Sequence, residues 1–210
     1  MAQYFRVHPV NPQLRLMRGA ADIVTRGGVI VYPTDSGYAL GCQVGNKEGV
    51  DRIRRLRGLD DDHYFTLICR DLSELSLYAR VDNASYRFLK AHTPGPYTFV
   101  LPASREVPRR LQHPKRRTIG LRVPDHAVVL ALLTAMAGPL ISVSLAAVDG
   151  PAPDPEDIRR QWEHSVDLVV DAGYCVGSPT TIVELDPDGA HVVRVGQGDI
   201  EPLLASDLRL

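Results

Sequence analysis

Cysteine is scarce in this sequence: Cys42, Cys69 and Cys175 are its three cysteines, and no two of them form a C-x-x-C pair. An odd number of widely spaced cysteines excludes a disulfide framework and a cysteine-built zinc site, so we expect reduced, mostly buried thiols. No segment approaches the roughly 18 apolar residues that a membrane-spanning helix needs. The first nine residues lack the apolar stretch of a secretory signal. These absences predict a cytoplasmic protein with no membrane partner.

The motifs of several enzyme classes are also missing. The sequence has no G-x-x-x-x-G-K-[ST] phosphate loop, no G-x-G-x-x-G dinucleotide fingerprint, no H-E-x-x-H zinc helix and no G-x-S-x-G nucleophile elbow. None of the seven histidines has a His, Cys or carboxylate partner at metal-ligand spacing, so we expect no protein-held metal. The formal net charge of −1 predicts no general attraction to nucleic acid or to anionic membranes.

The sequence has enough apolar residues to form a large core. Its 210 residues are 44% hydrophobic, and this length suits one domain, which we expect to span residues 1–210. Periodicity predicts helices at 13–26, 46–57, 84–91, 126–136 and 156–163, and strands at 29–32, 65–69, 97–101, 118–123, 140–144, 168–170, 181–185 and 192–195. The helix at 126–136 has almost no polar face and should be buried. The proline-rich segment 149–155 should be a surface loop or lid. The alternation predicts an α/β protein, a twisted mixed β-sheet flanked by helices.

A polar turn follows the first of these strands, over residues 34–41. Thr34, Ser36 and Tyr38 alternate there with residues that let the backbone bend, including Gly37 and Gly41. Open α/β sheets bind ligands at the carboxyl ends of their strands, so these hydroxyls could form the lip of a pocket. They could equally satisfy the backbone of their own turn, and the residues alone leave both interpretations open.

Three arginines lie where a surface charge is not expected. Helical spacing brings Arg57 back beside the apolar Ile53. Either Arg57 points toward an anion, or the helix ends at Gly58 and its arginines complement the negative helix terminus. Arg122 lies in the apolar strand 119–123 and needs a buried acid or a bound anion, and we favour the anion. Arg194 repeats the pattern in Val192-Val193-Arg194-Val195. Together these planar donors suit a phosphate or a carboxylate.

A basic stretch runs from Arg105 to Arg122, with seven basic residues against one acid. The stretch is either a solvated loop or a contact for the backbone phosphates of RNA. No aromatic residue alternates with these arginines, which argues against base stacking. The RNA hypothesis rests on Arg109, Arg110, Arg116 and Arg117.

Five segments, in this order, make the sequence resemble the YrdC-like family of threonylcarbamoyl-adenylate synthases, and most closely its YciO branch. They are 33–41 (PTDSGYALG), 93–101 (TPGPYTFVL), 119–124 (IGLRVP), 179–183 (PTTIV) and 193–196 (VRVG). The resemblance covers nearly the whole chain. It implies the YrdC fold, a twisted α/β sheet around a large positively charged cavity.

The family reaction joins threonine, bicarbonate and ATP into threonylcarbamoyl-AMP and releases pyrophosphate, for a tRNA modification. The resemblance therefore implies ATP with its Mg²⁺ as a substrate complex, a small amino acid as second substrate, and double-stranded RNA or tRNA as a possible partner. It places the catalytic residues at Arg55 and Arg57. The substrate- and nucleotide-binding residues would be Thr34, Tyr38, Arg122, Ser142, Ser144, Thr180 and Arg194.

Two family motifs are altered in this chain. The K-x-R motif reads Arg55-Leu56-Arg57, so a guanidinium replaces an ammonium, and the S-x-N motif reads Ser144-Leu145-Ala146, so an amide becomes a methyl group. Loss of one polar contact costs about 1–3 kcal/mol, or roughly ten- to a hundredfold in rate or affinity. The sequence thus predicts a nucleotidyltransferase with weak or altered synthase activity, or an RNA-binding protein without it.

Overall fold

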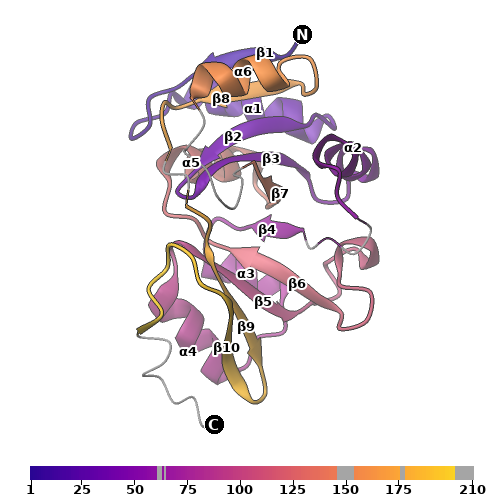
Figure 1. The fold of residues 1–210 in the computed structure, drawn as a ribbon, viewed down its shortest axis with the longest axis vertical. Coiled ribbons are helices and arrows are strands. Elements are labelled where there is room, and N and C mark those ends of the chain that lie inside the picture. Colours follow the sequence, from indigo (N-terminus) through magenta and orange to yellow (C-terminus); the bar gives the residue numbers. More distant parts are fainter. Residues whose placement is uncertain (61–62, 64, 146–153, 176–177, 202–210) are drawn as a thin grey trace.

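The computed structural model describes residues 1–60, 63, 65–145, 154–175 and 178–201. In that part of the chain ten strands form one mixed sheet in the order β1-β8-β2-β3-β7-β4-β6-β5-β9-β10. The strands are β1 (Gln3–Arg6), β2 (Ile30–Thr34), β3 (Gly37–Gln43), β4 (Thr66–Ile68), β5 (Tyr97–Pro102), β6 (Thr118–Arg122), β7 (Leu140–Ser144), β8 (Leu168–Asp171), β9 (Thr181–Asp186) and β10 (Gly189–Arg194). β4 links an upper half of the sheet, from β1 to β7, with a lower half that ends at β10 (Figure 1).

Six α-helices flank the sheet in the described residues: α1 (Leu14–Thr25), α2 (Lys47–Arg57), α3 (Leu72–Tyr78), α4 (Asn83–His92), α5 (Ala127–Met136) and α6 (Pro155–Trp162). Side chains cap the start of several of them. The Asn46 amide oxygen accepts from Gly49 N at α2, and the carboxylates of Asp71, Asp82 and Asp154 do the same at α3, α4 and α6. Such caps satisfy amide groups that a helix leaves without a partner in its first turn.

The two faces of the sheet carry separate apolar clusters because side chains of a strand alternate between faces. Ile30 and Tyr32 of β2 pack with α1 and α5, whereas Val29 and Val31 point to the opposite face. Apolar residues of α2, α3, α4 and α6 belong to this second cluster, which also takes alternate residues from β4, β5, β6 and β9. The lower half of the sheet is therefore packed with apolar side chains on one face, and its other face is available for a site.

The mixed α/β sheet flanked by helices is the architecture that the sequence predicts, but several details differ. Residues 34–41 are not a simple turn, because β2 and β3 pair as an antiparallel hairpin in which Thr34 faces Gly37. β1 and α3 were not predicted. α5 is not wholly buried: Thr134 and Ala135 are exposed, because α5 packs against α1 and β2 on one side only. The predicted loop at 149–155 lies outside the described residues, except that Asp154 and Pro155 begin α6.

Candidate functional site

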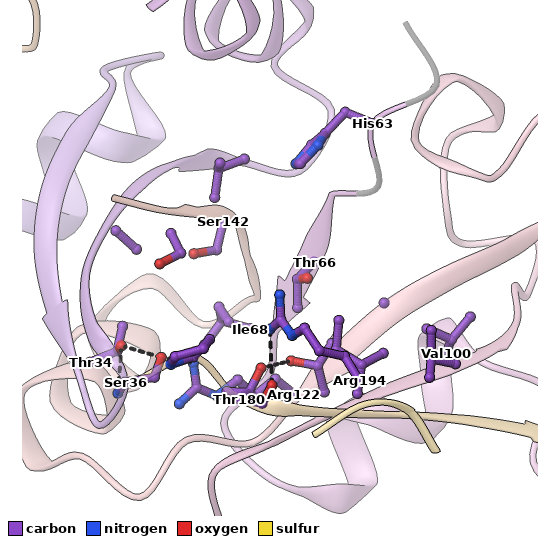
Figure 2. A pocket seen from close by; sticks show the side chains of 18 of the residues that line it. Thr34, Ser36, His63, Thr66, Ile68, Val100, Arg122, Ser142, Thr180 and Arg194 are labelled. Carbon is purple, nitrogen blue, oxygen red and sulfur yellow. Dashed lines mark hydrogen bonds between the residues drawn. The ribbon is translucent and has the colours of Figure 1, made fainter. Parts of the chain in front are cut away.

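A cavity of about 490 Å³ lies on the face of the sheet that carries α1 and α5 (Figure 2). Alternate residues of the lower strands line it: Thr66 and Ile68 of β4, Thr98 and Val100 of β5, Gly120 and Arg122 of β6, and Ile182 and Glu184 of β9. The residues between them, such as Leu67, Phe99 and Leu121, pack in the opposite apolar cluster. The volume falls within the roughly 300–1,000 Å³ typical of small-molecule sites.

The hairpin turn supplies one end of the cavity through Thr34 and Ser36, which are both buried and both line it. The Thr34 hydroxyl donates to Gly37 O at 2.6 Å and accepts from Ser36 N at 3.2 Å. Gly37 has a φ of 106°, which a residue with a side chain rarely adopts. Both interpretations of this segment are therefore correct: the threonine hydroxyl satisfies its own turn, and the turn lines a cavity.

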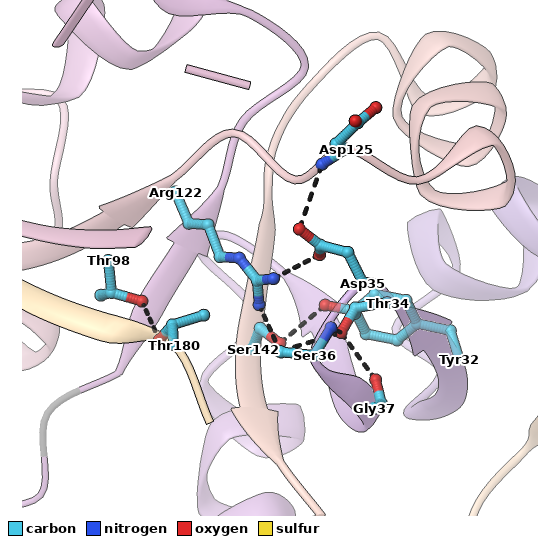
Figure 3. A network of polar contacts seen from close by, with 10 residues as sticks. All are labelled: Tyr32, Thr34, Asp35, Ser36, Gly37, Thr98, Arg122, Asp125, Ser142 and Thr180. Carbon is cyan, nitrogen blue, oxygen red and sulfur yellow. Dashed lines mark hydrogen bonds and ion pairs between the residues drawn. The ribbon is translucent and has the colours of Figure 1, made fainter. Parts of the chain in front are cut away.

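Arg122 corrects one prediction from the sequence. Its guanidinium forms an ion pair with Asp35 and donates to the Ser36 hydroxyl at 2.7 Å (Figure 3). Asp35 in turn accepts from the backbone N of Asp125 at 3.2 Å. The partner of Arg122 is therefore the carboxylate of Asp35 and not the predicted anion, although Arg122 still lines the cavity. Asp35 was overlooked because it lies 87 residues from Arg122 in the sequence.

Arg57 and Arg55 lie differently although they belong to one predicted motif. α2 ends at Arg57, and Gly58 follows with a left-handed φ of 59°. Arg57 lines the cavity, and its buried Nε atom has no hydrogen-bond partner in the described residues. Arg55 is exposed and is not among the residues that line the cavity. The helix does terminate at Arg57, and its last side chain also reaches the cavity; an anion at Arg57 stays a prediction.

Arg194 reaches the cavity from β10, which is an edge strand and not a buried one. Val193 and Val195 are about 60% exposed (60% and 62%), so the expectation of an arginine buried in an apolar strand is wrong here. The Arg194 guanidinium donates to Thr180 O at 2.9 Å, and partial burial lowers its pKa. Thr180 is buried, and its hydroxyl pairs with that of Thr98 at 2.8 Å.

Two predicted serines line the cavity from β7. The Ser142 hydroxyl accepts a hydrogen bond of 2.6 Å from the buried Tyr32 hydroxyl, and Ser144 lies at the exposed end of the strand. Ala146, which occupies the altered position of the S-x-N motif, lies outside the described residues.

Tyr38, also predicted as a binding residue, is not among the residues that line the cavity. Its hydroxyl donates to Gly173 O at 2.8 Å and accepts from Ala172 N at 3.2 Å, next to the buried carboxylate of Asp171. Burial raises the pKa of this hydroxyl well above its ordinary value. In this structure Tyr38 joins β3 to the segment after β8.

Among the lining residues that were not predicted from the sequence, His63 and Glu184 are the ionisable ones. Burial, together with the charges of Arg54 and Arg57, lowers the pKa of His63. Glu184 lies on β9 and forms an ion pair of 3.1 Å with Arg116 of the basic stretch. A signal for Glu184 was present in β9, where Ile182 and Glu184 alternate with the buried Thr181, Val183 and Leu185. His63 lies outside the strands, so this alternation gave no signal for it.

The charge balance of the cavity follows from these contacts. Asp35 compensates Arg122 and Glu184 compensates Arg116. Within the described part of the chain, Arg57 and Arg194 line the cavity without an acidic partner. They are the two cationic groups that an anion could engage without displacing a carboxylate.

The basic stretch is exposed at each predicted RNA-binding position, Arg109, Arg110, Arg116 and Arg117. Arg110 also donates to Gly45 O at 2.7 Å. No cluster of three or more metal-binding side chains occurs in the described residues, and no helix among them is long and apolar enough to cross a membrane.

The fold and the site define an α/β protein with an arginine-lined cavity on one face of a mixed sheet. Residues 22–196 match the Sua5, YciO and YrdC family model, described as telomere recombination. The chain belongs to this family.

Several relatives support this assignment. The uncharacterized protein YciO of Escherichia coli K12 is 52% identical over 97% of this chain and all of its own. Threonylcarbamoyl-AMP synthase of Nitrosococcus oceani is 35% identical over 73% of this chain and 84% of its own. The E. coli YciO crystal structure superposes with a TM-score of 0.91 at 51% identity, covering 96% of this chain and 99% of that one. Sua5 of P. abyssi, complexed with L-threonine, has the same fold, with a TM-score of 0.87 at 23% identity over 96% of this chain and 60% of that one.

Proposed function

We propose that this protein binds ATP and threonine in the cavity and forms threonylcarbamoyl-AMP from them and bicarbonate. The observation that carries the proposal is the pair Arg57 and Arg194, two cationic groups that line the cavity without an acidic partner in the described residues. Family membership with named synthases supports it, as does the L-threonine complex of the fold relative Sua5. Another relative of the fold, at 15% identity, is HypF in a phosphate- and nucleotide-bound form.

The proposed reaction needs positioning and charge stabilisation more than a covalent nucleophile. Threonine nitrogen and bicarbonate combine with loss of water to give a carbamate. A carbamate oxygen then attacks the α-phosphate in line, an oxygen–phosphorus bond forms, and the bond to the β-phosphate breaks with release of pyrophosphate. Arg57 and Arg194 would stabilise the negative charge on the phosphates. Magnesium would arrive with ATP as part of the substrate complex.

We expect the rate to be lower than that of a synthase with an intact K-x-R motif. Arg55 replaces the lysine of the motif and is exposed outside the cavity, so Arg57 is the member of the motif that lines the site. One missing charged contact corresponds to about a ten- to hundredfold loss.

Pyrophosphate release by the purified protein tests the proposal. We expect release that needs ATP, threonine and bicarbonate together, and a loss of about ten- to a hundredfold in kcat/KM in Arg57→Ala. Arg18→Ala, which removes an exposed arginine from α1, is the matched control and should match the wild type. Arg55→Ala shows whether the exposed arginine contributes. No release above the protein-free rate, or equal release without threonine, would overturn the proposal.

Double-stranded RNA or tRNA is a second candidate ligand, because the four arginines predicted to bind RNA are exposed and Arg116 also lies at the cavity. Binding through phosphates should weaken steeply with salt. Charge reversal at Arg109, Arg110, Arg116 and Arg117 should then reduce the affinity for a short RNA duplex and flatten its salt dependence. An unchanged affinity in this variant would exclude the RNA hypothesis.

A further inference from the structure

Glu184 is an unexpected group in a cavity suited to anions. Among the described residues that line the cavity, Glu184 is the one with a carboxylate, and its side chain is 22% exposed. A carboxylate repels phosphate, so it must face a part of the ligand that carries donor hydrogens and no negative charge. Arg116 holds it in place, with one Nη atom 3.1 Å from each carboxylate oxygen. This partner is 61% exposed, so the ion pair is weak and leaves acceptor sites on the carboxylate free for a ligand.

The surroundings of Glu184 differ from those of the hairpin turn. Thr34, Ser36, Ser142 and Ser144 give the β2, β3 and β7 end of the cavity its hydroxyls. The β5, β9 and β10 end has the apolar side chains of Val100, Ile182 and Val193, and its hydroxyls, Thr98 and Thr180, are paired with each other at 2.8 Å. Figure 2 shows Val100 and Arg194 on one side of the cavity and Thr34 and Ser36 on the other.

The strand order separates these two ends. Four strand spacings lie between β7 and β9, or about 19 Å at the usual distance between neighbouring strands. An amino acid cannot span that distance, whereas a nucleoside triphosphate can extend along it. The apolar end offers a surface for a flat base, and the hydroxyl-rich end suits the small acid.

Along β9, Thr180, Ile182 and Glu184 follow each other on the cavity side. Arg194 pairs in register with Ile182 and donates to Thr180 O, so it lies toward the start of β9 while Glu184 lies further along. A phosphate held at Arg194 would therefore have its sugar on the side of Glu184. Two vicinal hydroxyls match the two oxygens of a carboxylate, and carboxylates bind ribose hydroxyls in this manner in dinucleotide sites.

From this arrangement we infer that Glu184 binds the ribose hydroxyls of the nucleotide and makes the site selective for ribonucleotides. The inference rests on the nucleotide-binding part of the proposed function. It makes Glu184 a specificity-determining residue, while Arg57 and Arg194 bind the phosphates and Arg116 positions the carboxylate.

Calorimetric titration of the full chain with ATP, 2′-deoxy-ATP, 3′-deoxy-ATP and inorganic tripolyphosphate tests this role. We expect the wild type to bind ATP about tenfold more tightly than either deoxy form, because each deoxy form lacks one hydrogen bond to the charged carboxylate. Glu184→Ala should weaken ATP binding about tenfold, remove the discrimination and leave tripolyphosphate binding no weaker. Glu184→Gln, which keeps the shape and one acceptor, should lose part of the discrimination.

Glu163→Gln is the matched control, because Glu163 is also a partly buried glutamate paired with an arginine, at the end of α6 and away from the cavity. Equal wild-type affinity for ATP and both deoxy forms would overturn the inference. An equal loss of affinity for all three nucleotides in Glu184→Ala would do so too, as would weakened threonine binding with unchanged ATP binding, since Glu184 would then contact the amino acid. If ATP binds with ribose selectivity but no pyrophosphate is released, the proposed reaction fails and the role of Glu184 stands.

Discussion

At the scale of single residues, compensation of charge decides what each cavity group does. Asp35 and Arg122 pair with side chains that are 13% and 6% exposed, so neither charge is well solvated. A buried pair of this kind contributes little net stability when intact, but removal of one partner leaves an uncompensated charge. The pair therefore fixes the hairpin turn to β6, and the proposed anion site consists of Arg57 and Arg194.

Asp35→Ala should destabilise the protein by about 3–5 kcal/mol, because Arg122 would remain buried without its partner. Urea unfolding followed by circular dichroism measures this change. Asp157→Ala is the control: Asp157 pairs with Arg160 on α6 with both side chains more than 60% exposed (63% and 73%), and its loss should cost at most about 1 kcal/mol. Equal destabilisation by the two substitutions would show that the Asp35 pair behaves as a surface pair.

The cysteine thiols should be unreactive in the folded protein. Burial raises the pKa of Cys42 to about 12 and holds the pKa of the buried Cys69 well above its ordinary value. At pH 8 only about one Cys42 thiol in ten thousand would be ionised, and the thiolate is the reactive form.

Ellman's reagent at pH 8 should therefore leave Cys42 and Cys69 unmodified in the native Cys175→Ser variant, and should react with both in 6 M guanidinium. At pH 9 only about one Cys42 thiol in a thousand would be ionised, so the folded protein should still react far more slowly than free cysteine. A native reaction as fast as that of free cysteine would contradict the burial of these two residues.

At the scale of the elements, α2 and the lower strands position the site. Asn46 caps the start of α2 and also donates to Gly27 O at 2.9 Å, which anchors the helix to the segment before β2. Gly58 ends the helix and so determines where Arg57 enters the cavity. Gly120 leaves space in the cavity beside Thr66, since a Cβ atom there would lie 3.1 Å from the Thr66 hydroxyl oxygen.

Gly58→Ala should destabilise the protein by about 1–2 kcal/mol, because the left-handed conformation that ends α2 is sterically unfavourable for alanine. Thermal and urea unfolding measure the change. Gly138→Ala provides the control: nothing lies within 4 Å of its added Cβ, and its φ is not positive, so we expect a change within about 0.5 kcal/mol. If both substitutions have the same effect, the left-handed cap is not what Gly58 contributes.

At the scale of the whole molecule, the cavity lies where the two halves of the sheet meet. Thr34 and Ser142 come from the upper half and Thr180 and Arg194 from the lower half, so a ligand that fills the cavity contacts both. A ligand that binds the folded state alone stabilises it in proportion to the logarithm of its concentration over Kd.

Tripolyphosphate at a hundred times its Kd should stabilise the protein by about 2.7 kcal/mol and raise Tm by roughly 5–10 °C, as measured by differential scanning fluorimetry. The double variant Arg57→Ala with Arg194→Ala should lose this shift. Sodium chloride at equal ionic strength controls for screening. An equal rise in Tm with sodium chloride, or an undiminished shift in the double variant, would rule out the two arginines as the anion site.

Much of the architecture could be predicted from the sequence because helix and strand signals are local. The helices at Leu14–Thr25 and Lys47–Arg57 and the strand at Leu140–Ser144 follow from periodicity and stop signals that lie within a few residues. The short β1 and α3 were overlooked, since four and seven residues give too little periodic signal. The family motifs also indicated Thr34, Arg57, Ser142, Ser144, Thr180 and Arg194, all of which line the cavity.

The kind of fold, the family and the residue types available for an anion site could all be inferred from the amino-acid sequence. The tertiary structure decided which of those residues meet. It paired Arg122 with Asp35 and Arg116 with Glu184, removed Tyr38 and Arg55 from the cavity lining, and left Arg57 and Arg194 without acidic partners in the described chain. The physical reason is that backbone preferences act between neighbours in sequence, whereas compensation of a charge depends on groups that the fold brings together from distant positions, 87 residues apart for Arg122 and Asp35 and 68 for Arg116 and Glu184.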